Sequence, residues 1–287
     1  MNLYQGKNFK LLFNNEKDVS KYLCPNIFNF NNKTIFSCSV RYRKKKNYSE
    51  IRGYEINLGN LKLKKKIFVL KPSNYFINER YTSFLSPSIF KCDKKFFCLI
   101  QASKSNDAST TIILLQSNDL KHWQESDIQP FRKKKGLFSP YFFSHKKKKF
   151  IFYSKNLKNI SCNIYNSQLR KKIRKIEIYK NIDFKGYIYA PNVIKIDKYF
   201  YMFFAKWKNK NTGNLEILKS QDLFKWKKIS NGHLLNLNQQ IKIVSEPCII
   251  KYKFYHILLF ECKLTSTWNI GYIKIKNINY SKAYLKN

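Results

Sequence analysis

The segment Ser86-Pro87-Ser88-Ile89-Phe90 is one of five similar segments along the chain. The other four are Cys24-Pro25-Asn26-Ile27-Phe28, Ser139-Pro140-Tyr141-Phe142-Phe143, Ala190-Pro191-Asn192-Val193-Ile194 and Glu246-Pro247-Cys248-Ile249-Ile250. Each has apolar residues two and three positions after its proline, and together the segments hold five of the seven prolines. Recurrence every fifty to sixty residues or so is typical of a protein built from repeated units.

Each repeat predicts a β-hairpin. A second apolar run follows every segment at a constant distance, over residues 35–38, 97–100, 150–153, 201–204 and 257–260. Between the two runs lie pairs suited to a tight turn, namely Asn31-Asn32, Asp93-Lys94, Lys146-Lys147, Asp197-Lys198 and Lys253-Phe254. Proline is expected at the first residue of the first strand, where its missing N–H costs no hydrogen bond. The second strand is apolar on both faces and should be covered on both.

The intervals between repeats add further strands. Third strands are predicted at residues 52–58, 111–116, 163–166, 215–219 and 270–276, each followed by a shorter edge strand. Four short strands per unit predict an all-β, five-bladed β-propeller of one domain over residues 1–287. Its blades should start near Pro25, Pro87, Pro140, Pro191 and Pro247. The segment Asn2 to Phe13 is expected to pair into the last blade, which closes the ring and leaves no free edge.

The same signature, S-x-D-L-x-x-W, directly follows two of the predicted third strands. The copies are Ser117 to Trp123 and Ser220 to Trp226. Ser and Asp side chains can cap a turn, and the Trp can then pack on the sheet. We interpret the signature as structural, with a ligand contact as the alternative.

The residues beside the prolines are expected to surround the central channel, because the first strand of each propeller blade lines the axis. Among them only Glu246 is ionised. If the hairpin register is regular, the residue before each proline pairs with the residue fourteen positions after it, which places Glu261 opposite Glu246 with Cβ atoms about 5 Å apart. Two carboxylates with separated pKa values are the apparatus of glycoside hydrolysis. Alternatively, Glu261 points to solvent or pairs with a lysine, and Glu246 accepts a backbone or lysine hydrogen bond.

Other residues near the repeats are candidates for contacts with a sugar. Stacking on a sugar ring is one role for the aromatic residues Tyr22, Tyr141, Tyr189 and Trp207, and packing is the other. Asn26, Ser88 and Asn192 follow prolines and offer polar groups to the channel. Arg41 and Arg80 could hold an anionic group or lie on the surface.

The formal net charge of +39 suggests a polyanion partner, but most of the charge is lysine in a chain rich in Asn, Ile, Phe and Tyr. Such a composition follows from A/T-rich codons, and arginine, which reads bases, is scarce. We therefore expect no nucleic-acid partner. The basic runs 43–46, 64–66, 132–135 and 146–149 are interpreted as solvated loops, with an acidic-sugar or polyanion face as the alternative.

Metal, disulfide and membrane signals are weak in this sequence. Seven cysteines without a C-x-x-C pair argue against a disulfide framework and against a structural zinc site. The four histidines, at 122, 145, 233 and 256, lack metal-binding spacing, so no metal or cofactor is predicted. Neither a secretory signal nor an apolar run of about 18 residues is evident. We expect a monomer in the cytoplasm with no membrane span.

The five proline segments and the two S-x-D-L-x-x-W signatures resemble the five-bladed propeller glycoside hydrolases, the arabinanase, levansucrase and invertase group that includes glycoside hydrolase family 43. The resemblance covers all five blades. It implies a base Asp before the proline of blade 1, a second Asp after the proline of blade 2 and an acid Glu just ahead of the proline of blade 3. Those positions hold Cys24, Ser88 and Phe138-Ser139 here, so the family's three carboxylates are not matched.

Two interpretations follow. In one, the chain binds a glycoside in the central cleft and hydrolyses it or transfers a glycosyl group with Glu246 and Glu261, and the metabolism of surface polysaccharide is the expected setting. In the other, it is a carbohydrate-binding or scaffold propeller that has lost catalysis.

Overall fold

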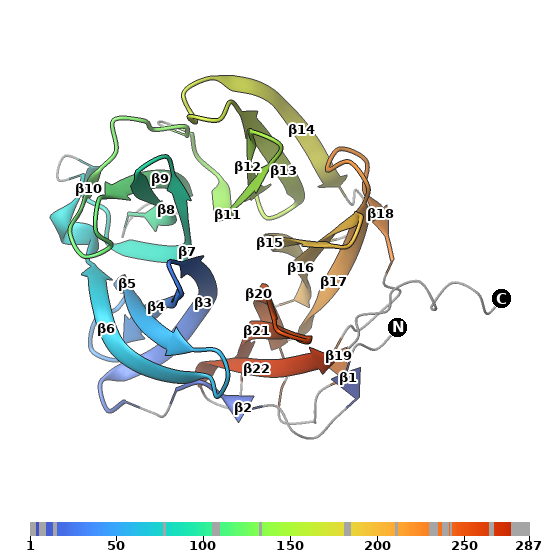
Figure 1. Ribbon diagram of the computed structural model, residues 1–287. Coiled ribbons are helices and arrows are strands. Elements are labelled where there is room, and N and C mark those ends of the chain that lie inside the picture. The colour runs from blue at the N-terminus through green and yellow to red at the C-terminus, as the bar shows by residue number, and fades with distance from the viewer. Residues whose placement is uncertain are drawn as a thin grey trace.

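Antiparallel blades form a ring around a central axis (Figure 1), and single parallel backbone pairs join several neighbouring blades into one longer sheet. The computed structural model describes residues 4–5, 10–13, 16–76, 79–104, 110–131, 134–180, 185–209, 212–229, 235–236, 241, 243–263 and 267–276. Blade 1 contains β3 Val19–Phe30, β4 Lys33–Tyr42, β5 Ser49–Asn57 and β6 Lys62–Leu70. Blade 2 contains β7 Ser83–Cys92, β8 Lys95–Ser103, β9 Thr110–Ser117 and β10 Trp123–Glu125. Blade 3 contains β11 Leu137–His145, β12 Lys148–Lys155, β13 Asn159–Tyr165 and β14 Lys172–Lys180.

Blade 4 contains β15 Tyr187–Ile196, β16 Tyr199–Asn209, β17 Thr212–Ser220 and β18 Lys227–Lys228. Blade 5 contains β20 Ile243–Tyr252, β21 Tyr255–Lys263, β22 Trp268–Lys276 and, from the N-terminal part of the chain, β2 Lys10–Leu11. Outside the blades, β1 Tyr4–Gln5 pairs with β19 Leu235–Asn236, and Pro72–Asn74 forms a 3-10 turn. The prediction of an all-β, five-bladed propeller is confirmed. Within the described part of the chain, no helix has the length and apolarity needed to cross a bilayer.

The five inner hairpins turn where the sequence predicts. Phe30 pairs with Lys33 and Tyr252 with Tyr255, and the other three hairpins close on equivalent pairs. The first turn residue has a positive φ in all five, and the second does so at Asn32 and Lys147. These conformations are those of the tight turns whose twist matches that of the two strands.

The position of the five prolines differs from the expected one. Each proline lies inside its strand, at a β-bulge, and not at the first residue. The residue before it has a left-handed φ between 44° at Glu246 and 56° at Ala190. The bulge explains how a proline fits inside a strand, since the ladder of hydrogen bonds is already interrupted there.

The core lies between neighbouring blades. The described buried apolar residues form five clusters, one at each seam of the ring. The second strand of a blade contributes to the interfaces with both neighbouring blades. In blade 4, Phe203 of β16 packs toward blade 5, and Met202 of the same strand packs toward blade 3. Apolar residues on both faces of the second strand are therefore required by the fold.

The N-terminal segment completes blade 5. Lys10 and Leu11 pair with Tyr272 and Gly271 of β22, and Leu12 N–H donates to Ile270 O at 2.9 Å. This pairing is the predicted ring closure, although part of the predicted segment lies outside the described residues. Closure hides the edge of β22, which would otherwise offer unpaired backbone groups to another chain.

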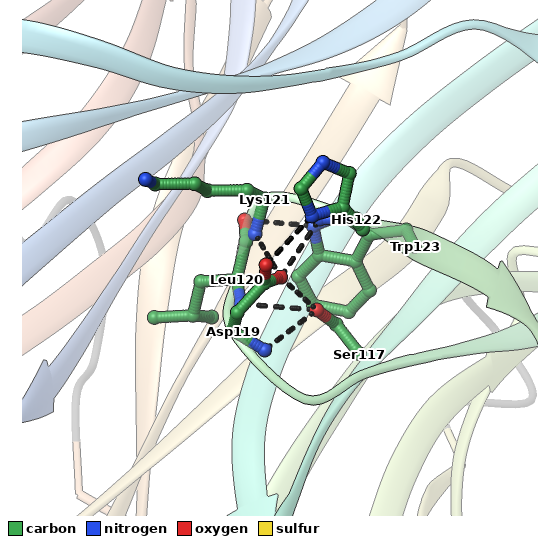
Figure 2. Close-up of polar contacts among 6 residues, drawn as sticks. All are labelled: Ser117, Asp119, Leu120, Lys121, His122 and Trp123. Atoms are coloured by element: carbon green, nitrogen blue, oxygen red, sulfur yellow. Dashed lines mark hydrogen bonds and ion pairs between the residues drawn. The ribbon is translucent and has the colours of Figure 1, made fainter.

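The S-x-D-L-x-x-W signature caps the turn after the third strand (Figure 2). Ser117 Oγ accepts hydrogen bonds from the backbone N–H groups of Asp119 and Leu120, and the Asp119 carboxylate accepts from those of Lys121 and His122. The Trp123 indole N–H donates to Leu120 O at 3.0 Å. The copy in blade 4 repeats this pattern, with Ser220, Asp222 and Trp226 as the equivalent residues. These bonds give the signature a structural role.

The described residues of the basic runs are exposed apart from the half-buried Lys149, but the runs are not all loops. Lys64, Lys65 and Lys66 lie in the outer strand β6, and Lys148 and Lys149 begin β12. A strand at the rim of a blade can expose consecutive lysines because its long side chains reach water on either face.

Candidate functional site

A cavity of about 450 Å³ opens at one end of the central axis. Its lining residues come from all five blades: Lys21, Leu23, Cys24, Arg41, Leu85, Ser86, Gln101, Phe138, Ser139, Leu157, Tyr187, Tyr189, Trp207, Glu246, Glu261 and Trp268. Clefts that bind small molecules generally measure about 300 to 1,000 Å³. The volume therefore suits a ligand the size of one or two sugar rings.

The bulges set the register at the floor of this cavity. Glu261 pairs with Ser245, the residue before Glu246, so the predicted direct pairing of Glu246 with Glu261 is wrong by one residue. The reason is that Glu246 and Pro247 are both left out of the ladder by the bulge. The side chains still converge, because one carboxylate oxygen of each lies within 4.8 Å of the other.

Glu246 is held by serine hydroxyls from two other blades. The Ser139 hydroxyl donates to Glu246 Oε1 at 2.9 Å, and the Ser86 hydroxyl lies 3.4 Å from the same oxygen. Ser86, Ser139 and Glu246 each precede a repeat proline, so the same bulge points all three toward the axis. Burial raises the pKa of Glu246, and the two hydroxyls partly offset this because they stabilise the carboxylate.

Glu261 is 7% exposed and lies against blade 1. Its Oε2 accepts a hydrogen bond from Cys24 N–H at 3.3 Å, and Cys24 Sγ lies 3.9 Å from the same oxygen. Burial and then the negative charge of Glu246 raise the pKa of Glu261, whereas the Cys24 N–H, Arg41 and Lys21 act in the opposite direction. Two carboxyl groups this close, one buried and one half-buried, do not both ionise readily. The pair is therefore expected to hold one proton near neutral pH.

Aromatic side chains form one wall of the cavity. The Trp207 and Trp268 rings lie 5.8 Å apart at an interplanar angle of 18°, and Tyr189 meets Trp207 edge-on with centroids 5.4 Å apart. Trp207 Nε1 is buried and has no hydrogen-bond partner among the described residues. An aromatic wall suits a ligand with apolar ring faces, whereas the N–H edge of the Trp207 indole lies against Gly213 of β17.

Five of the predicted sugar-binding residues lie outside the cavity. The Asn26 and Asn192 side-chain oxygens accept hydrogen bonds from the backbone of Ile89 and Ile249, and Ser88 Oγ accepts from Phe142 N–H. Tyr141 OH donates to Val193 O. These residues join neighbouring blades because the position after each proline faces the next first strand.

The remaining channel is too narrow for a sugar. Asn26, Tyr141 and Asn192 line a space of about 20 Å³, close to the volume that one water molecule needs. Tyr22 is 2% exposed and stacks on Phe13 with ring centroids 3.9 Å apart, so it belongs to the core between blades 1 and 5. Arg80 is exposed and does not line the cavity.

Cys24, Glu246 and Glu261 are the described residues that come closest to a metal-ligand set. One possible ligand atom from each lies within 4.8 Å of the other two. Burial and the charges of both carboxyl groups raise the pKa of the Cys24 thiol, so the thiolate that metals prefer is disfavoured. Arg41 and Lys21 also oppose a bound cation. The raised pKa of the thiol and the two nearby cations both work against a metal ion here.

Sequence reasoning missed several cavity residues. Lys21 and Trp268 are backbone partners at the seam between blades 5 and 1, and Gln101 accepts a hydrogen bond from Ser139 N–H at 3.0 Å. The repeat contains a signal for Gln101, because this residue lies fourteen positions after Pro87, as Glu261 does after Pro247. It contained none for Trp268, because that residue reaches the axis only when the ring closes.

A five-bladed ring with a cavity on its axis is the architecture of the propeller glycoside hydrolases. Residues 96–249, more than half of the chain, match the family model described as the glycosyl hydrolases family 32 N-terminal domain. The chain belongs to this family, and the resemblance drawn from the proline repeats is confirmed at the level of the superfamily. A comparison with curated proteins gave no match.

Solved structures of low sequence identity share the fold. A thermostable family-43 glycoside hydrolase is 14% identical, with 89% of each chain covered and a TM-score of 0.71. The GH43_1 enzyme from Xanthomonas citri complexed with xylose is 8% identical, with 93% of this chain and 90% of that chain covered and a TM-score of 0.73. The catalytic domain of the Coprinopsis cinerea GH62 alpha-L-arabinofuranosidase is 8% identical, with 92% and 95% covered and a TM-score of 0.70.

Proposed function

We propose that this protein binds a glycoside in the axial cavity and cleaves or transfers its glycosyl group with Glu246 and Glu261 as the acid and base pair. The observation that carries the proposal is a close carboxyl pair, Glu261 buried and Glu246 half-buried, at the floor of a cavity walled by Trp207 and Trp268. The family match and the sugar-bound structural neighbour support a carbohydrate ligand.

The chemistry follows from the proton that the pair shares. The protonated carboxyl group donates to the leaving glycosidic oxygen, and the ionised partner attacks or stabilises the anomeric carbon. Inverting glycosidases separate their carboxyl groups by about 6.5 to 9.5 Å to leave room for water, whereas retaining enzymes hold them about 5 to 5.5 Å apart. The oxygen separation of at most 4.8 Å favours retention of anomeric configuration.

A binding module without turnover is the second candidate. It is favoured by the absence of carboxylates at Cys24, Ser88 and Ser139, where the family resemblance would place its catalytic acids and base. In that case the cavity holds a sugar and Glu246 acts as a hydrogen-bond acceptor only.

Turnover separates the two candidates. The unmodified protein should hydrolyse or transglycosylate at least one member of a panel of nitrophenyl furanosides and pyranosides, and NMR should show the anomer of retention. Glu246→Gln and Glu261→Gln should each lower kcat by a factor of about 10² to 10⁴ and keep sugar binding, because an amide has a similar shape but cannot transfer the proton.

Glu177→Gln is the matched control, since Glu177 lies on the outer strand β14 and does not line the cavity. EDTA should leave turnover unchanged, and a stoichiometric transition metal in the purified protein would contradict the proton-sharing pair. Sugar binding without turnover in the unmodified protein would favour the binding module. Glu246→Gln with unchanged kcat would exclude a catalytic role for that residue.

We also propose a cytoplasmic monomer without a nucleic-acid partner. All seven cysteines are buried and free, which fits a reducing compartment. Size-exclusion chromatography with light scattering tests the monomer, and nucleic-acid binding that survives physiological salt would contradict the absence of that partner.

A further inference from the structure

Two cationic side chains face each other at the edge of the cavity. Lys21 of β3 and Arg41 of β4 are register partners on paired strands, and both line the cavity. Like charges that lie directly opposite on a sheet are destabilising. Such a pair is more easily explained if something else in the functional state carries the opposite charge.

The described residues do not neutralise this pair. Neither Lys21 nor Arg41 forms an ion pair with a described carboxylate, and Arg41 Nε is buried with no hydrogen-bond partner among those residues. Burial lowers the pKa of Lys21, and so does the positive charge of Arg41. Glu261 is the nearby carboxyl group that favours the charged lysine, but burial and the charge of Glu246 raise its own pKa and so disfavour its ionised form.

The surroundings of the pair define the shape of a ligand. Lys21 Nζ lies 6.0 Å from the centroid of the Trp268 ring, so the cations lie beside the aromatic wall. Arg41 and Lys21 are also close enough to Glu261 to influence its pKa. A single ring on that wall could therefore contact the cations at one side and the carboxyl pair at the other.

We propose that the cavity selects an anionic glycoside, with a ring carboxylate or phosphate group held between Arg41 and Lys21. The position of the sugar ring and of the reacting bond rests on the proposed function, whereas the anion site can be tested by itself. A guanidinium offers a planar fork of donors and an ammonium a compact charge, and hydrogen bonds between ionised partners are about twice as strong as neutral ones. The anion would remove the repulsion between the two cations.

Matched sugar pairs test the proposal by isothermal titration calorimetry at 150 mM salt. The probes are methyl glucoside, methyl glucuronide and glucose 6-phosphate, then the corresponding galactosides, and then arabinose with arabinose 5-phosphate. We expect the anionic member of at least one set to bind tenfold or more tightly than its neutral match. The comparison of glucuronide with phosphate identifies which anionic group is preferred.

Variants locate the site. Arg41→Gln should reduce the preference to about twofold or less, and Lys21→Gln should weaken it in the same direction. Arg174→Gln removes an equal charge from the exposed strand β14 and should keep the full preference, which controls for the large net charge of the chain. Circular dichroism and thermal unfolding check that each variant is folded.

Three outcomes would overturn the inference. Equal affinity for the neutral and the anionic sugar of each set would show that the cavity binds sugars without discriminating between them by charge, and the proposed function would stand. A preference that survives both Arg41→Gln and Lys21→Gln would place the anion elsewhere on the basic surface. If no member of any set binds, the anion site and the sugar cavity fail together.

Discussion

A buried carboxyl group normally lies beside a cation that stabilises its charge, whereas the buried Glu261 lies beside a second carboxyl group, that of the half-buried Glu246. The hydroxyls of Ser86 and Ser139 and the backbone N–H of Cys24 supply some compensation. The remaining cost is reduced by retaining a proton, which is also what an acid catalyst needs. The same feature therefore links the stability of the protein to its proposed chemistry.

This linkage predicts an unusual dependence of stability on pH. Both carboxyl groups have a raised pKa in the folded state, so the folded state binds more protons than the unfolded state. The contribution of the pair to the free energy of unfolding therefore falls as pH rises from about 4.3, the pKa of a free glutamate, through the folded pKa values. Glu261→Gln lacks the part of this loss that belongs to Glu261 and keeps the part that belongs to Glu246. Its free energy of unfolding, measured with urea, should exceed that of the unmodified protein at pH 9 by on the order of 1 to 3 kcal/mol, and the advantage should shrink toward pH 5.

Glu177→Gln again provides the control, since an exposed carboxyl group should show no such trend. A difference between Glu261→Gln and the unmodified protein that stays constant from pH 5 to pH 9 would contradict the raised pKa values.

The strands show how a local irregularity builds the cavity. The bulge before each proline turns one side chain per blade toward the axis, and a glycine on a neighbouring strand can make room for a large one. Gly213 of β17 pairs with Trp207 of β16, and a Cβ added at Gly213 would lie 2.2 Å from Trp207 Cδ1. The indole can therefore lie over β17 only because residue 213 has no side chain.

Gly213→Ala should disturb the aromatic wall more than the fold. The Trp207 ring must move, which should lower sugar affinity at least fivefold and change tryptophan fluorescence, while overpacking costs about 1 to 3 kcal/mol of stability. Gly53→Ala is a matched control, because its Cβ would lie 2.2 Å from the Phe68 ring, away from the cavity. Equal effects of the two variants on sugar binding would show that Trp207 does not contact the ligand.

The ring as a whole depends on contacts between blades, because the apolar clusters lie at the seams. The seam between blades 5 and 1 joins distant parts of the sequence and includes Phe13, which is 7% exposed and stacks on Tyr22. Lys21, Arg41, Glu261 and Trp268 meet at the cavity end of this seam. Closure of the ring is thus a condition for forming the site.

Phe13→Ala should lower the free energy of unfolding by about 3 to 5 kcal/mol, as expected for a buried phenylalanine. Deletion of residues 1–13 should lower it further and promote association at high concentration, because the edge of β22 becomes free. Thermal unfolding and light scattering measure these effects. Phe254→Ala is the control, as that side chain is 92% exposed and should be nearly neutral. An unchanged unfolding midpoint in the deletion variant would show that the ring does not need this segment.

The recurring prolines, the apolar runs and the tight-turn residues were enough to predict five hairpins and hence the propeller, because each of these signals acts within a few neighbouring residues. They also pointed to Glu246 and Glu261 and to Trp207, Tyr189 and Arg41, which do line the cavity. The register at Glu246, the packing of Tyr22 and the inter-blade bonds of Asn26, Ser88, Tyr141 and Asn192 depended on the tertiary structure, because a bulge and a neighbouring blade decide where those side chains point. The contact of Cys24 with Glu261, 237 residues away in the sequence, exists only because the ring closes.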